Sequence, residues 1–230
     1  MVQRKEYLDL LKKWKDEDVI KVVTGIRRCG KSTLLKMYQS HLKEQGVTDD
    51  CIIYINFEEL EYEELLDYRM LYDYVKERLH PEKITYVFLD EIQRVEDFQK
   101  AVDSLHVKSN VDIYITGSNS SLFSSEIATL ISGRYVEIKM LPLSFTEFVQ
   151  ATKQEKQLSQ AYRQYVETSS FPYVIELLQT PDEITSYLEG IYNTILVKDI
   201  IDRKKIADTL VLKSVSQFLF DNIGNNILYC

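Results

Sequence analysis

The sequence predicts an α/β protein, with a mostly parallel β-sheet flanked by helices and followed by a small all-helical region. Two observations point to this fold class. Up to about residue 140, five short runs rich in β-branched and aromatic residues alternate with segments of helical hydrophobic period, which is typical of a parallel sheet with helices on both faces. Beyond that point, helical patterns replace the strand-like runs.

The strand-like runs are Val19–Thr24, Cys51–Asn56, Ile84–Leu89, Val111–Thr116 and Tyr135–Lys139. Several of them are almost continuously apolar, as expected for strands that are covered on both faces. The helical patterns between them are Ser32–Glu44, Tyr62–Leu79 and Val95–Val107. Strand and helix therefore alternate throughout the first part of the chain.

The second part begins with a helix start, because Ser144 and Glu147 form the S-x-x-E pattern of a capping box. Further helical segments are expected near residues 155–167, 173–179, 183–201 and 207–222. We therefore expect a core domain over residues 1–142. Residues 143–230 are expected to form a helical region that leads into an incomplete C-terminal domain.

Composition excludes several classes of protein. Hydrophobic residues make up 45% and charged residues 28% of the chain, which is typical of a globular protein and not of a disordered one. No apolar run approaches the roughly 20 residues that a membrane span needs, and the N-terminus lacks the apolar core of a secretory signal. Cys29, Cys51 and Cys230 are scattered, so a reduced, cytoplasmic protein without membrane association is expected.

The formal net charge of −8 argues against general nucleic-acid binding. A short basic stretch nevertheless includes Lys198 and residues 203–205. A nucleic-acid or protein target therefore stays open at this point.

The segment GIRRCGKS matches the phosphate-binding pattern G-x-x-x-x-G-K-[ST] and lies between a predicted strand and a predicted helix. In such a P-loop the backbone N–H groups and the helix N-terminus attract phosphate, and Gly25 and Gly30 permit the tight backbone path. Lys31 is expected to bind the β- and γ-phosphates, Ser32 to reach Mg²⁺, and Thr33 to donate to the α-phosphate.

The loop is also unusually cationic, since it carries Arg27 and Arg28. Arg28 is a candidate for facing phosphate. Cys29 contributes backbone to the loop, and in an electropositive turn its thiol pKa could fall, although we expect its side chain to take no part in the chemistry.

Asp90 and Glu91 follow the predicted strand Ile84–Leu89, at the edge where ligands bind in open α/β sheets. Asp90 suits the role of holding Mg²⁺ through its water shell. Glu91 suits the role of orienting and polarising the attacking water. The alternative, surface acids at a strand end, explains neither their order after the P-loop nor their pairing.

The next strand runs into the polar residues 116–120, among which Ser118 is a candidate for sensing the terminal phosphate of the nucleotide. A helix N-cap explains the same small polar residues equally well. Arg134, at the entry to the last predicted strand, is a candidate arginine finger acting within the chain or on a neighbouring subunit. A surface arginine at a strand start is the alternative.

Several segments together resemble a family of prokaryotic AAA-type ATPases in which a P-loop core precedes a C-terminal domain of unknown function. They are VVTGIRRCGKSTLL, YVFLDEIQ, YITGSNSSL, SGRYVEIKMLPLSFTEF and GIYNTILVKDIIDR. The similarity extends over nearly the whole chain, and its most family-specific segment is LPLSFTEF. Members usually continue well beyond the point where this sequence stops.

The resemblance implies a P-loop NTPase fold of the ASCE type, with the sensor strand between the P-loop strand and the Asp90 strand. It also implies ATP as the nucleotide, Mg²⁺ as the metal and Glu91 as the hydrolytic carboxylate. The leading hypothesis is an ATPase that drives a conformational change in an attached domain, in a homo-oligomer or alone. The alternative is a nucleotide-gated interaction switch with negligible turnover; a small-molecule kinase is less favoured.

Overall fold

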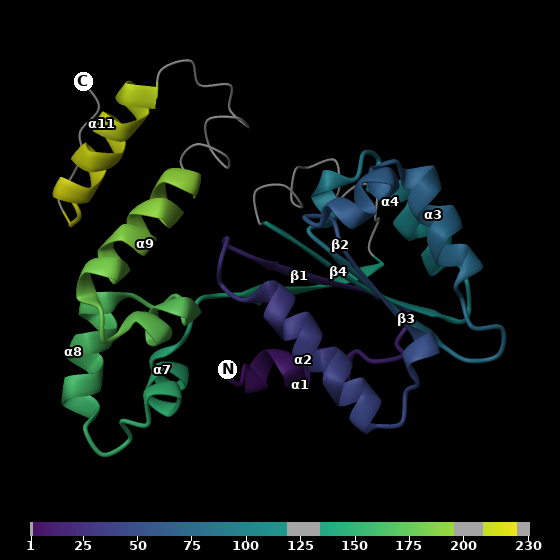
Figure 1. Ribbon diagram of the computed structural model, residues 1–230, viewed down its shortest axis with the longest axis horizontal. Helices are drawn as coiled ribbons and strands as arrows, with labels where there is room; N and C mark the ends of the chain where they lie inside the picture. Colours follow the sequence, from purple (N-terminus) through teal and green to yellow (C-terminus); the bar gives the residue numbers. More distant parts are fainter. Residues whose placement is uncertain (1, 119–133, 196–208, 225–230) are drawn as a thin grey trace. The chain divides into compact units, whose positions relative to one another are not determined.

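The computed structural model describes residues 2–118, 134–195 and 209–224 (Figure 1). The chain divides into two compact units, residues 1–179 and 180–230. Helices α7 (Phe145–Thr152) and α8 (Leu158–Thr168) and the 3₁₀ segment η4 (Pro172–Leu177) belong to the first unit. A functional division at residues 142/143 stays a prediction.

The first unit is built on a five-stranded sheet with the order β2-β3-β4-β1-β5, in which every neighbouring pair is parallel. The strands are β1 (Ile20–Gly25), β2 (Ile52–Asn56), β3 (Thr85–Asp90), β4 (Val111–Ser118) and β5 (Tyr135–Met140). All five predicted strands are present to within one or two residues at either end. The strand order also places β4 between β1 and β3, as the resemblance implied, so the α/β P-loop fold class is confirmed.

Helices cover both faces of this sheet (Figure 1). Helices α1 (Lys5–Lys13) and α2 (Lys31–Glu44) pack on one face, where Leu11, Leu35 and Phe88 belong to one buried cluster. Helices α3 (Tyr68–Glu77) and α4 (Phe98–His106) pack on the other. The nearly continuous apolar strands are explained by this double coverage.

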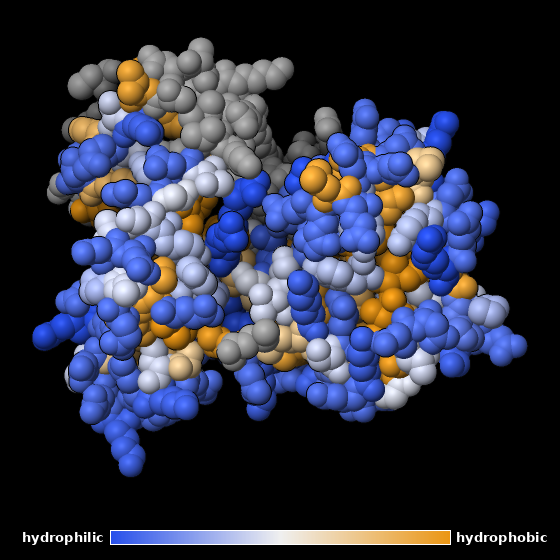
Figure 2. Space-filling view, in the orientation of Figure 1, coloured by the Kyte–Doolittle hydropathy of each residue, from blue (hydrophilic) through white to orange (hydrophobic). Residues whose placement is uncertain are grey.

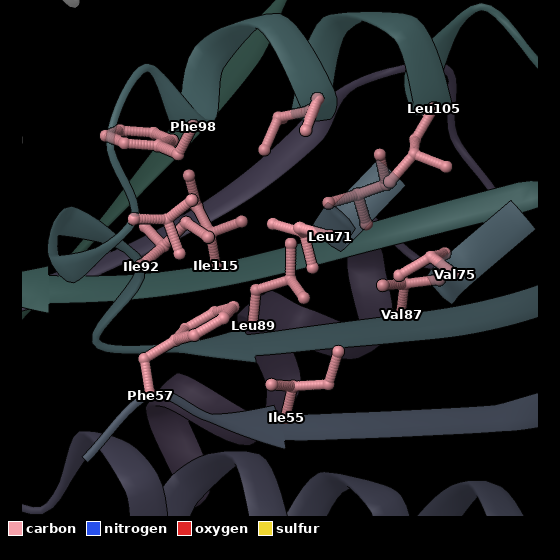
Figure 3. Packing of buried hydrophobic residues seen from close by; sticks show 14 of the residues in the cluster. Ile55, Phe57, Leu71, Val75, Val87, Leu89, Ile92, Phe98, Leu105 and Ile115 are labelled. Atoms are coloured by element: carbon pink, nitrogen blue, oxygen red, sulfur yellow. The ribbon is translucent and has the colours of Figure 1, made fainter. Parts of the chain in front are cut away.

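The cluster beneath α3 and α4 is the larger of the two (Figure 3). In it, Leu71 of α3 and Leu105 of α4 lie against Val87 and Leu89 of β3 and Ile115 of β4. Burial of such side chains contributes roughly 1.5–3 kcal/mol each. The space-filling view shows mainly hydrophilic residues on the face drawn, with smaller hydrophobic patches between them (Figure 2).

One predicted helix is divided in the structure. Residues Leu60–Leu66 form the 3₁₀ segment η2, and α3 begins only at Tyr68. The cause is Asp67, whose extended backbone and side chain cap a new helix by accepting the N–H groups of Arg69 and Met70. The prediction of one helix over Tyr62–Leu79 was therefore wrong. Helix α1 lies ahead of all the predicted elements.

The predicted capping box is present at the start of α7. Ser144 Oγ accepts the Glu147 N–H at 3.3 Å, and Glu147 Oε2 accepts the Ser144 N–H at 2.8 Å. Aromatic contacts of Phe145 and Phe148 with Tyr165 hold α7 against α8. The predicted helical segment near 173–179 is the 3₁₀ segment η4.

The second unit contains α9 (Pro181–Thr194) and α11 (Thr209–Asp221). The Tyr192 and Phe220 rings of these helices lie 6.4 Å apart between centroids. The predicted helix over 183–201 is confirmed as far as the described residues extend, and the basic stretch around residues 198–205 falls outside them. None of the described helices has the length and apolar character required to cross a membrane.

Candidate phosphate-binding site at the carboxyl edge of the sheet

Three predicted motifs meet at one edge of the sheet because the strands that carry them are parallel. Strand β1 ends at Gly25, β3 at Asp90 and β4 at Ser118. In the register, Gly25 lies opposite Ser118, and Leu89 lies opposite Ile115. The P-loop and both predicted carboxylates are therefore neighbours at the carboxyl ends of the strands, where open α/β sheets bind ligands.

The P-loop connects β1 to α2 along a path that both of its glycines permit. A Cβ on Gly25 would lie 2.4 Å from the Met140 carbonyl oxygen of β5, so no larger residue fits there. Gly30 caps α2 with φ +104°, a conformation that favours glycine. Arg28 also adopts a left-handed conformation, with φ +65°, which is uncommon for a residue with a side chain.

Lys31 opens α2, and its ammonium group lies under the loop. Lys31 Nζ donates to the carbonyl oxygens of Gly25 at 3.2 Å and Ile26 at 3.4 Å. It also forms an ion pair with Glu91 Oε1 at 3.5 Å, and the side chain is only 4% exposed. A lysine, the helix N-terminus and the loop backbone therefore converge at one place, which gives it a positive potential.

Asp90 is fully buried at the end of β3, and protein donors reach both of its carboxylate oxygens. Thr116 Oγ1 donates to Oδ1, and Tyr54 OH donates to Oδ2 at 2.9 Å. Each oxygen retains a second lone-pair direction. Burial, followed by the negative charge of Asp90, raises the pKa of Tyr54 and keeps this phenol a donor.

Glu91 directly follows β3 in a left-handed conformation, with φ +55°. Its N–H donates to Thr116 Oγ1 at 3.0 Å, and its Oε2 accepts from Gln93 Nε2 at 2.5 Å. Strained backbone of this kind costs about 1–3 kcal/mol and clusters at functional sites. Here it turns the carboxylate of Glu91 toward Lys31.

The remaining predicted P-loop residues lie in or next to this cradle. Ser32 and Thr33 occupy the first turn of α2 and are half-buried, and Arg28 is exposed. Cys29 is fully buried in the core under α2. Burial raises the pKa of the Cys29 thiol, so the expectation that it could fall in an electropositive turn is corrected.

Two predicted residues remain, Ser118 and Arg134. Ser118 ends β4 beside Gly25, and its side chain falls outside what the structure describes. Arg134 lies at the amino edge, where its carbonyl oxygen accepts the Ile20 N–H at 2.8 Å. The length of β1 separates Arg134 from the P-loop, about 17 Å at ordinary strand rise. The structure does not bring Arg134 to the cradle of its own chain.

Thr116, Tyr54 and Gln93 belong to the site but were not assigned roles from the sequence. Thr116 contacts both acids through a single hydroxyl group. The register could have identified it, since Thr116 follows Ile115 as Asp90 follows Leu89, whereas the prediction chose Ser118 two residues later. Tyr54 reaches Asp90 from β2, and nothing in the local sequence indicates that contact.

A second group of candidate metal ligands lies at the opposite edge of the sheet, made of Asp50, Cys51 and His80. His80 Nδ1 accepts the N–H groups of Glu82 and Lys83 at 3.1 and 3.0 Å, so in neutral histidine the proton is on Nε2. Nε2 is the nitrogen that faces Asp50, at 3.7 Å. A protonated nitrogen cannot ligate a metal, and this group is better explained as a polar contact.

Comparison with known proteins agrees with a P-loop domain in the first unit of the chain. The family of AAA domains matches residues 17–149. An uncharacterized protein of Haemophilus influenzae is 44% identical over 229 residues, which cover 97% of this chain and 56% of that protein. The uncharacterized protein MJ1544 of Methanocaldococcus jannaschii is 31% identical over 227 residues, covering 90% and 48% respectively. The chain thus spans about half the length of the curated relatives it matches.

Among solved structures, the Walker-type ATPase PABY2304 of Pyrococcus abyssi is similar, with a TM-score of 0.57 and 16% identity. The similarity covers 89% of this chain and 76% of that one. At this level of identity the likeness shows a shared fold.

Proposed function

This chain belongs to the family of AAA domains, and from that membership and the geometry of the carboxyl edge we propose that it binds ATP and hydrolyses it with Mg²⁺. One observation carries the proposal. Lys31 and Glu91, on separate elements, face each other at 3.5 Å beside a loop whose path favours glycine at positions 25 and 30. The Lys31 ammonium and the Glu91 carboxylate approach each other because both side chains point toward the space beside the P-loop.

The cradle suits a phosphate chain. Loop N–H groups and the N-terminus of α2 supply partial positive charge, and Lys31 adds a full one. Lys31 Nζ rests on two loop carbonyl groups at 3.2 and 3.4 Å, which are long hydrogen bonds. We propose that it exchanges these bonds for shorter ones to the terminal phosphates, in which donor and acceptor both carry a charge.

The donor set also suits Mg²⁺, which prefers oxygen ligands and keeps part of its water shell. Ser32 offers a hydroxyl group in the first turn of α2, and Asp90 offers a carboxylate whose oxygens each retain a lone pair. When bound, the metal would neutralise charge developing on the phosphates during transfer. Tyr54 and Thr116 hold the Asp90 carboxylate in one orientation for this purpose.

Glu91 is positioned to handle the attacking water. Its carboxylate lies between Lys31 and Gln93, and the Gln93 Oε1 atom is buried without a partner in the described part of the chain. A buried carbonyl oxygen without a donor costs about 1–3 kcal/mol, and a water held next to Glu91 would satisfy it. We propose that Glu91 accepts a proton from this water as the water oxygen bonds to the γ-phosphorus. The bond from that phosphorus to the bridging oxygen breaks, which leaves ADP and inorganic phosphate.

The consequence of hydrolysis would be a conformational change in the attached domain that the longer relatives imply. Arg134 would act only from a neighbouring copy, since its place at the amino edge excludes the cradle of its own chain, and a homo-oligomer is part of this proposal. A nucleotide-gated switch with negligible turnover is the second candidate, because the same residues at the strand ends would bind nucleotide without hydrolysing it.

Steady-state phosphate release and ATP binding should be measured for the wild type, Lys31→Ala and Glu91→Gln. A hydrolase loses about 10²–10⁴-fold in turnover on Glu91→Gln while retaining ATP. A switch shows the same negligible turnover in the wild type and in Glu91→Gln, with ATP binding intact. If the wild type neither binds ATP nor releases phosphate, both functions are excluded.

A further inference from the structure

One buried arginine lies outside the segment that matches the AAA family. Arg4 precedes α1, and its side chain is 4% exposed. Its guanidinium donates to groups that are distant in the sequence: the P-loop, the connection after β5 and helix α7. Such a residue is positioned by the whole fold and not by its neighbours in the chain.

The contact with the P-loop fixes one peptide plane. Arg4 Nη1 donates to the carbonyl oxygen of Cys29 at 3.0 Å, in a buried environment. In a trans peptide the carbonyl group and the following N–H point in opposite directions. Holding the Cys29 carbonyl toward Arg4 therefore directs the Gly30 N–H the other way. Gly30 itself carries no side chain that could restrict the rotation of this peptide, and its φ is +104°.

The other nitrogens of Arg4 hold the start of the helical segment. Arg4 Nη2 donates to the Leu141 carbonyl at 2.6 Å, and Nε donates to Glu147 Oε1 at 2.8 Å. The second oxygen of Glu147 completes the capping box with Ser144. The Glu147 carboxylate thus connects the first turn of α7 to Arg4. Arg4 in turn connects that turn to the P-loop.

The guanidinium is too enclosed to contact phosphate itself. Cys29, Leu141 and Glu147 occupy it from three directions, and the face of the group lies over the Tyr7 ring, 4.8 Å from its centroid. An arginine finger needs free donors that reach the transferred group. The donors of Arg4 are already occupied and do not reach the transferred group, so Arg4 acts through the P-loop backbone to which it is hydrogen-bonded.

We propose that Arg4 is a positioning residue: it keeps the Cys29–Gly30 peptide in the phosphate-binding orientation, and through Glu147 it links occupancy of the P-loop to the first turn of α7. The inference rests on the proposed ATP binding. Coupling between two places is reciprocal, so nucleotide that favours the held loop also favours the capped α7. The LPLSFTEF segment then has a role in this coupling, because its glutamate is Glu147, which connects α7 to Arg4.

The test uses the full chain with four variants: Arg4→Ala, Arg4→Lys, Glu147→Gln and the Arg4→Lys/Glu147→Gln pair. Affinity for Mg-ATP is measured by titration with a fluorescent ATP analogue and is expressed per folded molecule. Arg4→Lys keeps the charge but loses the fork that reaches three directions. It should weaken Mg-ATP binding about tenfold or more, since a hydrogen bond to a charged group is lost from the loop.

Asp112→Asn is the matched control, because it disturbs a buried ion pair at the opposite edge of the sheet. It should lower stability and leave affinity per folded molecule unchanged. The paired variant should weaken binding by less than the product of the two single effects, since both act through one link. Hydrogen exchange at residues 145–149 should slow on Mg-ATP binding in the wild type and not in Arg4→Lys.

The outcomes separate the two proposals. If the wild type does not bind Mg-ATP, the proposed function fails and this inference fails with it. If the wild type binds and Arg4→Lys and Glu147→Gln bind equally well while losing stability, Arg4 only supports the fold and this inference alone is overturned. Should Arg4→Ala fail to fold, Arg4→Lys and Glu147→Gln still decide between these results.

Discussion

The two edges of the central sheet hold buried charges in opposite ways. At the amino edge, Lys21 of β1 and Asp112 of β4 form an ion pair at 2.5 Å, and both side chains are almost fully buried. Lys21 also donates to the Glu17 carbonyl at 2.8 Å, and Asp112 accepts the Asp16 N–H at 3.0 Å and the Tyr114 hydroxyl at 2.9 Å. Both Lys21 and Asp112 therefore have several close partners.

The carboxyl edge is looser. Lys31 and Glu91 approach only to 3.5 Å, the Lys31 hydrogen bonds to the loop are long, and Gln93 Oε1 has no partner in the described part of the chain. The amino edge, whose buried charges have all their close partners within the protein, stabilises the fold. The carboxyl edge retains polar groups that can bind a ligand. Substitutions should therefore separate the two, with stability lost at one edge and nucleotide chemistry lost at the other.

The largest expected effect is at the amino edge. Asp112→Ala leaves the Lys21 ammonium buried without its partner, which should lower the free energy of unfolding by about 3–5 kcal/mol. Urea denaturation measures it, and the paired replacement Lys21→Met/Asp112→Leu should recover most of the loss. A large fall in Mg-ATP affinity per folded molecule would contradict the separation of the two edges.

The next effect is at the carboxyl edge. Lys31→Ala removes the charged donor that faces the phosphates and should weaken Mg-ATP binding per folded molecule about 10- to 100-fold. Its loss of stability should be smaller than that of Asp112→Ala, because Lys31 and Glu91 approach only to 3.5 Å. Lys43→Ala is the control, because Lys43 is an exposed residue in the last turn of the same helix, paired with Asp49 at 2.6 Å. Calorimetric titration of both variants decides; equal affinities would contradict the assignment of Lys31.

A smaller effect is expected for Thr116→Val, which keeps the shape but removes the hydroxyl shared by Asp90 and Glu91. Turnover should fall about tenfold, since one hydrogen bond contributes about 1 kcal/mol and the freed groups lose orientation. Thr85→Val is the matched control at the other end of β3, where the Thr85 hydroxyl accepts the His80 N–H at 2.9 Å. Its turnover should match the wild type.

The smallest effect at neutral pH is expected for Tyr38→Phe, about 0.5–1.5 kcal/mol in stability, because one neutral hydrogen bond is lost. The Tyr38 and Tyr114 hydroxyl oxygens lie 3.2 Å apart in the core. Burial raises the pKa of Tyr38 to about 12 from an ordinary value of 10.0, and the same holds for Tyr86.

These raised pKa values predict a loss of stability in alkali. The unfolded chain releases the phenol protons near pH 10 while the folded chain retains them to about pH 12, so stability falls as pH rises through this window. The slope is about 1.4 kcal/mol per pH unit for each such phenol. Tyr38→Phe should make the decline shallower, and an unchanged slope in urea denaturation from pH 10 to 12 would contradict it.

The parts of the site that follow from local chemistry were predictable from the sequence. The P-loop glycines, Lys31 and the acid pair lie at strand ends that the apolar runs already marked, and parallel pairing brings them together. The place of β4 between β1 and β3 followed from the family resemblance. The capping box at Ser144 was also visible as a local pattern.

The parts that depend on register or on distant contacts were not. Choosing Thr116 over Ser118 requires knowing which residue of β4 lies beside Asp90. Arg4 has partners 25 to 143 residues away, and no local pattern marks it. Arg134 was predicted at the entry to β5, and because β5 runs parallel to β1 this position lies at the amino edge. The break at Asp67 arose from a cap within an otherwise helical pattern.

The central claim is that the carboxyl edge, with Lys31 and Glu91 at its centre, receives the terminal phosphates of ATP. A crystal structure of the Glu91→Gln variant grown with Mg-ATP tests it most directly. We expect the γ-phosphate within hydrogen-bond distance of Lys31 Nζ, the metal beside Ser32, and residue 91 facing the phosphate. Nucleotide bound at any other place on the chain, or a P-loop left empty at saturating Mg-ATP, would contradict it.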